Sequence, residues 1–228
     1  SSLKEFDEQS VQIESYLRHL FVKDAARGFA FIDLCRQQYD VILMNPPFGD
    51  ATSNVSKLTS KHFSHPKIDL GMVFIESMTD QLISNGLIGA ITSRTFVAND
   101  TLEGWRDDYL LGRRSLLDVM IDLGIGVLDD ALVEVAAYVL TKSSSNLKSP
   151  FFIKVLDERE KELAVKTFFN FDTYQNFERT TFHITPVRFF KEITSKTLCY
   201  WLPTSLINHI ARAKAIAETG GISRSGPA

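Results

Sequence analysis

Apolar residues recur along the chain in two patterns, which predict buried strands separated by amphipathic helices. Continuous apolar runs at 41–44 and 87–92 predict strands that are buried in a parallel sheet. Between them, residues 69–82 place apolar side chains three and four positions apart, which predicts a helix that Asn85-Gly86 ends. The alternation of strand and helix is typical of an α/β protein.

The following segment predicts a helix over 99–113 and then a strand, a turn and a strand. The string Asp122-Leu123-Gly124-Ile125-Gly126 has the form of a glycine-rich cofactor loop. It lacks a third small residue at the expected spacing, and a β-rich run at 133–141 follows it instead of a helix. We therefore interpret 117–141 as a strand, a turn and a strand.

Serine-rich residues 143–150 predict a linker, which divides the chain into a part at 1–142 and a smaller α+β part at 151–228. At the other end, residues 1–20 have helical apolar spacing. Residues 19–22 are interpreted as a short strand that ends at Asp24. The smaller part carries a predicted strand at 151–156, a charged helix at 157–166 and a helix at 206–217. Between the helices, the stretch up to Trp201 is rich in aromatic residues. Their rings could form a base-stacking surface, but we expect them in a core or a seam between subdomains.

Composition narrows the class of protein. The chain has 228 residues, of which 44% are hydrophobic and 23% charged, enough for one sizeable core. A net charge of −3 lacks the basic character of an autonomous nucleic-acid-binding module, so any DNA contact must be local or supplied by missing parts. Cys35 and Cys199 are too far apart for a metal motif, and no apolar run reaches the ~20 residues of a membrane span. These features favour a cytoplasmic protein without a membrane anchor.

The stretch Tyr39–Gly49 joins the first predicted strand to a stiff polar turn, Asn45-Pro46-Pro47-Phe48. The two prolines fix successive φ angles and donate no backbone hydrogen bond, so this loop offers acceptors. An aromatic amine is a poor nucleophile because its lone pair is delocalised into the ring. The Asn45 side-chain oxygen and the Pro46 carbonyl are placed to accept from both N–H groups of such an amine. Phe48 would then stack on the base, a contact worth about 1–3 kcal/mol.

The alternative interpretation is an ordinary Asn-Pro turn. From average residue usage, an Asn-Pro-Pro-aromatic string arises by chance in a chain of this length on the order of once in several hundred cases. The polar segment 49–67 after this motif is either a basic lid over DNA phosphates or a solvated loop. His62 and His65 lie within it without a nearby cysteine or acidic cluster, so we expect no metal site.

The motif and its strand resemble the second half of the catalytic domain of N6-adenine DNA methyltransferases that carry an Asn-Pro-Pro-Phe motif, above all type IIG restriction-modification and BREX phage-defence methyltransferases. The resemblance implies part of a Rossmann-like sheet with a C-terminal antiparallel hairpin, S-adenosylmethionine as the methyl donor, and transfer to a flipped adenine in double-stranded DNA. It also implies possible restriction or defence-system subunits as partners. In this family the motif serves amino-group methylation.

The resemblance also assigns roles to residues outside the motif. Asp24, or its rival Asp33, falls where relatives contact the adenine ring of the cofactor. Asp69 and Phe74 fall near positions that wall the cofactor pocket, although Phe74 also fits a core role. Leu128 stands where an aromatic residue often packs against the flipped base.

The family's glycine-rich cofactor motif and its ribose-binding acid have no match in this sequence. We therefore expect a partial catalytic domain that binds S-adenosylmethionine weakly by itself and leads into a missing target-recognition domain. Two other functions stay open, namely an RNA or protein amine or amide methyltransferase and a nucleic-acid-binding module that flips bases without chemistry.

Overall fold

The computed structural model describes residues 21–24, 26–30, 32–49, 63, 69–128, 133–143, 149–169 and 181–219. The chain divides into two units, Ser1–Gln38 and Tyr39–Ala228. In the first unit, residues 21–24, 26–30 and 32–36 are helical. The strand predicted at 19–22 is therefore wrong at Phe21 and Val22, because a helix satisfies its backbone groups locally whereas a strand needs a neighbouring strand. The helix predicted at 1–20 lies outside the described residues.

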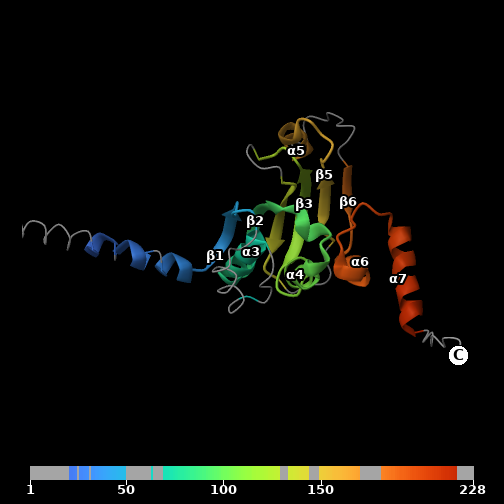
Figure 1. The fold of residues 1–228 in the computed structure, drawn as a ribbon, viewed down its shortest axis with the longest axis horizontal. Helices are drawn as coiled ribbons and strands as arrows, with labels where there is room; N and C mark the ends of the chain where they lie inside the picture. Colours follow the sequence, from blue (N-terminus) through green and yellow to red (C-terminus); the bar gives the residue numbers. More distant parts are fainter. Residues whose placement is uncertain are drawn as a thin grey trace, which may run out of the picture. The chain divides into compact units, whose positions relative to one another are not determined.

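The second unit is built on one six-stranded sheet of order β1-β2-β4-β3-β5-β6 (Figure 1). The pairs β1–β2 and β3–β5 are parallel, and the pairs β2–β4, β3–β4 and β5–β6 are antiparallel. The predicted α/β class and late antiparallel hairpin are confirmed. The strands are β1 (Tyr39–Met44), β2 (Leu82–Ser93), β3 (Leu116–Gly124), β4 (Val135–Thr141), β5 (Phe151–Lys154) and β6 (Thr181–Ile184).

The pairing brings the carboxyl ends of β1, β2 and β3 to one edge of the sheet. Strands β1 and β2 are parallel, and β2 and β3 share the direction opposite to β4, which lies between them. In open α/β sheets, ligands bind outside the carboxyl ends of parallel strands. The loop after β1 therefore lies at the edge where a ligand is expected.

One face of the sheet carries the main core, and α3, α4 and α6 contribute to it. Met72, Trp105 and Phe190 from these helices pack with sheet residues such as Ile88 and Leu140, all five being fully buried. Burial of each such side chain contributes roughly 1.5–3 kcal/mol. The helices are α3 (Leu70–Asp80), α4 (Glu103–Tyr109), α5 (Lys161–Phe169), α6 (Val187–Glu192) and α7 (Thr204–Thr219), with 3-10 turns η1 (Arg94–Val97), η2 (Asp100–Leu102) and η3 (Thr194–Lys196).

The opposite face is covered only in part by the described residues. Ala164 of α5 packs there against Ile153 in a second cluster. Beside it, an apolar hollow of about 610 Å³ is lined by Leu43, Gly89 and Phe169, among others. The prediction that 41–44 is a fully buried strand is wrong, since Leu43 is 80% exposed and Val41 53%. In the described sheet β1 is an edge strand that pairs with β2 alone.

Several boundaries differ from the predictions. Helix α3 begins after Asp69 as expected but ends at Asp80, and Asn85 lies inside β2 with φ 62° at an irregular stretch of the β1–β2 pairing. Asn-Gly is a turn signal, and here it marks a local departure from strand geometry, not a helix stop. The helix predicted at 99–113 is shorter, because Tyr109 ends α4 and a turn follows.

The C-terminal predictions hold in outline. Strand β5 and helices α5 and α7 form where strand or helix was expected, and the aromatic residues Phe152, Phe190 and Tyr200 are buried as a core. The division at 143–150 stays a prediction, while β5 pairs with β3 in the common sheet. None of the described helices is long and apolar enough to cross a membrane.

Candidate functional site

The predicted catalytic loop follows directly after β1, which ends at Met44. Asn45 and Pro47 are exposed, Pro46 is buried and Phe48 is half-buried. The backbone N–H of Leu70 donates to the Gly49 carbonyl at 3.1 Å. This bond ties the end of the loop to the first residue of α3, so the loop is held at both ends by regular structure.

Asp69, predicted to wall the cofactor pocket, caps α3. Its Oδ1 accepts from the backbone N–H of Gly71 at 2.7 Å, a cap worth about 0.5–2 kcal/mol. A β-carbon at Gly71 would lie 3.2 Å from that oxygen and 3.4 Å from Thr92 Cγ2, so Asp69 and Thr92 lie on either side of the same glycine. The cap gives the carboxylate a structural role, and the predicted cofactor role stays a prediction.

Thr92 in turn contacts a buried tyrosine on β4. The Thr92 and Tyr138 hydroxyl oxygens lie 3.1 Å apart. Burial raises the pKa of Tyr138 above its usual range, and the negative charge of Asp69 adds to the rise. Tyr138 therefore stays a neutral phenol, with its hydroxyl next to Thr92 near the carboxyl end of β2.

Phe48 and Leu128, the two residues predicted to contact a base, share one apolar cluster. Both pack against buried residues of the second cluster, which contains Leu123 and Val135. Residues 125–128 form a bend after β3, so this strand brings Leu128 to the edge where β1 presents Phe48. These two residues are 80 positions apart in the sequence, and in the fold both pack against the same cluster.

The other predicted residues have separate outcomes. Phe74 of α3 is 41% exposed, so the core role considered for it is wrong. Asp24 lies in the first unit, where it forms an exposed 3.9 Å ion pair with Arg27, and its cofactor role stays a prediction. His62 and His65 lie outside the described residues. Among the residues that the structure describes, no group of histidine, cysteine and carboxylate side chains is arranged to hold a metal ion.

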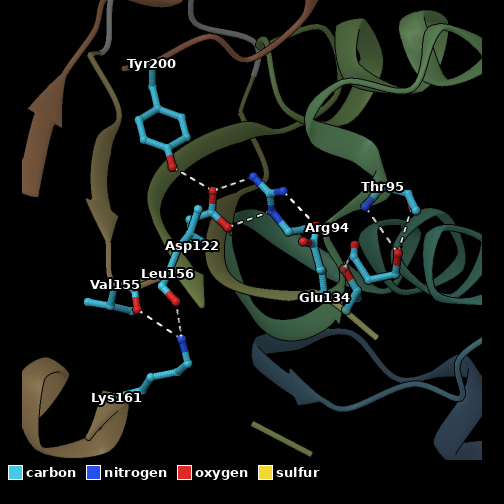
Figure 2. A network of polar contacts seen from close by, with 10 residues as sticks. Arg94, Thr95, Asp122, Glu134, Val155, Leu156, Lys161 and Tyr200 are labelled. Carbon is cyan, nitrogen blue, oxygen red and sulfur yellow. Dashed lines mark hydrogen bonds and ion pairs between the residues drawn. The ribbon is translucent and has the colours of Figure 1, made fainter. Parts of the chain in front are cut away.

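A buried ion pair lies at the same edge of the sheet, and the sequence did not reveal it. Asp122 of β3 is fully buried and accepts from Arg94 Nε and Nη2, each at 2.8 Å, and from the Tyr200 hydroxyl at 2.6 Å. Arg94 Nη1 donates to Glu134 at 2.9 Å. Figure 2 shows Asp122 between Tyr200 and Arg94. The sequence signal that could have indicated this ion pair is the acid within the apolar run 119–123, because a carboxylate buried in such a run needs partners.

The charges of this network reinforce one another. Burial alone lowers the pKa of Arg94, but the hydrogen bonds and charges of Asp122 and Glu134 outweigh burial and raise it. Burial, followed by the charge and hydrogen bond of Asp122, raises the pKa of Tyr200 above its usual range. Arg94 is thus a fixed cation and Tyr200 a fixed neutral donor. The network joins η1, β3, the residue before β4 and the segment before α7.

Comparison with known proteins gives this arrangement a context. A family model described as Eco57I restriction-modification methylase matches residues 2–124. The type II methyltransferase M.BanIII of Aneurinibacillus aneurinilyticus is 34% identical over 110 residues, which make up 45% of this chain and 18% of that protein. The chain thus spans less than a fifth of this relative.

Two solved structures share the fold at low sequence identity. One belongs to a study of assembly and conformational transition in the type I restriction-modification system, with a TM-score of 0.52, 15% identity, and coverage of 80% of this chain and 43% of that one. The other is the DrdV–DNA complex, with a TM-score of 0.50, 17% identity, and coverage of 76% and 19%. At this identity the likeness concerns the fold alone.

Proposed function

Because this chain belongs to the Eco57I restriction-modification methylase family, we propose that it forms the base-holding part of a DNA adenine N6-methyltransferase. The supporting observation is the position of the Asn45–Phe48 loop. It leaves the carboxyl end of β1, its end is bonded to α3, and Phe48 packs in the same cluster as Leu128. A base amine directed at this loop meets oxygen acceptors and an aromatic face.

In the proposed reaction, the Asn45 side-chain oxygen and the Pro46 carbonyl accept from the two N–H groups of the adenine amine. These bonds favour a tetrahedral nitrogen whose lone pair is available for attack. Phe48 and Leu128 hold the ring of a base flipped out of the duplex, which an enzyme must do to reach an atom inside the stack. The contribution of the loop is therefore orientation of a weak nucleophile.

We propose S-adenosylmethionine as the cofactor, which supplies an electrophilic methyl group when bound. The exposed ring of Phe74 and the carboxylate of Asp69 are the candidate wall. The Asp69 cap keeps that carboxylate at the start of α3, where Leu70 is bonded to Gly49 at the end of the loop. These residues fit one side of a cofactor pocket, and the sequence carries no match to the family's glycine-rich motif. Double-stranded DNA with a flipped adenine, together with restriction or defence-system subunits, are the proposed partners.

The test is methyl transfer by the full-length protein. It is incubated with S-adenosylmethionine and unmethylated DNA, and the digested DNA is analysed by mass spectrometry for N6-methyladenine and N4-methylcytosine. Asn45→Ala should lower the N6-methyladenine yield by about 10²–10³-fold, the size of effect seen when one catalytic hydrogen-bonding group is removed. Asn208→Ala, at an exposed position of α7, is the matched control and should leave the yield unchanged.

Other products would contradict the proposal in distinguishable ways. N4-methylcytosine without N6-methyladenine would show that the loop methylates an amino group as proposed but that the target base is cytosine. Methylation of RNA or protein in place of DNA would move the protein to a different substrate class. An Asn45→Ala yield equal to that of the unaltered protein would remove Asn45 from the site.

A further inference from the structure

A second hollow, of about 480 Å³, opens at the same edge of the sheet as the catalytic loop. Strand β2 ends at Ser93, which pairs with Val135, the first residue of β4, so the residues before and after this pair meet there. The wall combines polar and apolar side chains, and Trp201 comes from the distant segment before α7. The lining residues are Ser93, Arg94, Thr95, Val97, Ala98, Val133, Glu134 and Trp201.

The charges at the wall argue against a phosphate ligand. Arg94 is the cation of this hollow, and it already pairs with Asp122 through two nitrogen atoms and with Glu134 through the third. One guanidinium therefore stands against two carboxylates, which leaves a net negative charge. Glu134 is the more accessible of the two acids, with 51% of its side chain exposed. Such a wall favours a neutral ligand that carries N–H donors.

Trp201 supplies a flat apolar surface held in position by its neighbours. Its ring is 44% exposed, and it packs edge-on against Tyr200, with ring centroids 5.1 Å apart and an interplanar angle of 84°. Tyr200 is itself buried, stacks on Phe152 with centroids 4.7 Å apart, and donates to Asp122. The exposed indole is thus attached to the most constrained part of the network, and little conformational entropy is lost when a ligand stacks on it.

We propose that this hollow binds a nucleobase, which stacks on Trp201 and donates an N–H group to the Glu134 carboxylate. This inference rests on the proposed function in one respect, because it takes the bound base to be a neighbour of the target adenine in the same DNA. Met44 at the end of β1 pairs with Ala90, and β2 runs parallel to β1 as far as Ser93, so the hollow and the catalytic loop lie at the same edge of the sheet.

The sequence contains two tryptophans, which makes the site directly observable. Trp105 is fully buried in the core, so quenching of tryptophan fluorescence by a bound base reports on Trp201. The chain is titrated with a duplex that carries one unpaired base, with the fully paired duplex, and with a duplex that has an abasic residue at the same position. Adenosine and inorganic phosphate are titrated separately, because a base in this hollow has either DNA or a free nucleoside as its source.

We expect the duplex with the unpaired base to quench the fluorescence and to bind about ten-fold more tightly than the abasic duplex. Trp201→Ala should remove this ten-fold preference, measured by anisotropy of labelled DNA, and Trp201→Phe should retain part of it. Phe182→Ala, which removes an exposed aromatic ring on β6, is the matched control and should leave the preference intact. Glu134→Ala should weaken binding of bases that present an N–H group more than binding of bases without one.

Quenching by adenosine in the absence of DNA would assign the base to a free nucleoside and retain the nucleobase site. Equal binding of the abasic and unpaired duplexes, or quenching by inorganic phosphate alone, would overturn it. Unchanged preference in a folded Trp201→Ala variant would overturn it as well. These readouts do not involve methyl transfer, so a protein that yields no N6-methyladenine but shows the Trp201-dependent preference would refute the proposed function and keep this site.

Discussion

At the scale of single residues, Asp122 is the side chain on which most of the polar structure at the site depends. Its carboxylate is fully buried and accepts three hydrogen bonds from Arg94 and Tyr200. A buried charge that loses its partner is far more costly than a surface ion pair, because the remaining group keeps its desolvation penalty. The network should therefore respond differently from the surface pairs of the same chain.

We predict that Asp122→Ala lowers the free energy of unfolding by about 3–5 kcal/mol, since it leaves the Arg94 guanidinium and the Tyr200 hydroxyl without their buried acceptor. Urea denaturation followed by circular dichroism measures the change. Asp157→Ala, which removes an exposed acid 3.9 Å from Lys154, is the control and should cost less than about 1 kcal/mol. Similar losses in the two variants would show that the buried network adds no stability.

The raised pKa of Tyr200 predicts a dependence of stability on alkaline pH. The unfolded chain releases the phenol proton near its ordinary pKa of about 10, whereas the folded protein retains it to higher pH. The stabilising effect is therefore complete below about pH 10 and is lost as the pH rises from there toward the folded-state pKa. Tyr200→Phe should reduce the slope of unfolding free energy against pH above 10, measured by urea titrations at several pH values. An unaltered slope would contradict the assignment.

At the residue scale, the sequence indicates chemistry that is local and does not reveal contacts between distant residues. Asn45, Pro46, Pro47 and Phe48 are consecutive, so the string itself indicates both a stiff turn and its acceptors. Asp122 meets partners 28 and 78 positions away, and no pattern around it specifies which cation or hydroxyl will approach. Trp201 belonged to an aromatic-rich stretch, and only the fold shows that it lines the same hollow as Glu134.

At the scale of elements, the end of β3 controls where the bend carrying Leu128 begins. Gly124 is the last residue of the strand and has φ +69°, and a β-carbon there would lie 2.8 Å from Leu156 Cδ2. Gly126 has φ +82°, and a β-carbon there would meet no atom within 4 Å. The two glycines therefore share the left-handed backbone and differ in the space around them.

This pair separates backbone strain from steric contact. Gly126→Ala should lower the free energy of unfolding by about 1–2 kcal/mol through the left-handed conformation alone. Gly124→Ala should cost that amount plus about 0.5–1.5 kcal/mol, because the Leu156 side chain must move away from its rotamer. Thermal and urea denaturation of both variants provides the measurement. Equal losses would mean that Leu156 moves aside without cost.

Element prediction succeeded for periodic segments and failed where neighbours decide the outcome. The spacing of apolar residues located α3 to within two residues, and the cap that Asp69 forms became visible only in the structure. Asn85-Gly86 was interpreted as a helix stop because the turn signal is the same inside an irregular strand. The exposure of β1 depends on its place in the sheet, which an apolar run of four residues does not encode.

At the scale of the whole molecule, the chain matches the family over 2–124 and spans 18% of the M.BanIII relative. The α/β class and the late hairpin followed from the sequence because each element is short and strongly patterned. The position of β4 between β2 and β3 did not, since strand order is a property of long-range pairing.

We predict that this chain by itself binds S-adenosylmethionine with a Kd weaker than about 100 μM, which corresponds to less than ~6 kcal/mol of binding free energy. The reason is that the sequence offers a candidate wall in Asp69 and Phe74 but no match to the glycine-rich cofactor motif. Isothermal titration calorimetry provides the measurement, with S-adenosylhomocysteine as a second ligand. Binding in the low micromolar range would refute the prediction.

The open apolar face beside β1 also governs how the protein behaves as a solute. Leu43, Val41 and the hollow next to them place hydrocarbon in water on an edge strand, a combination that promotes contact between copies. Sulfate strengthens such contacts because it is excluded from protein surfaces. Ammonium sulfate should therefore precipitate this chain at lower concentration than a Leu43→Lys variant, in which a charge interrupts the same face.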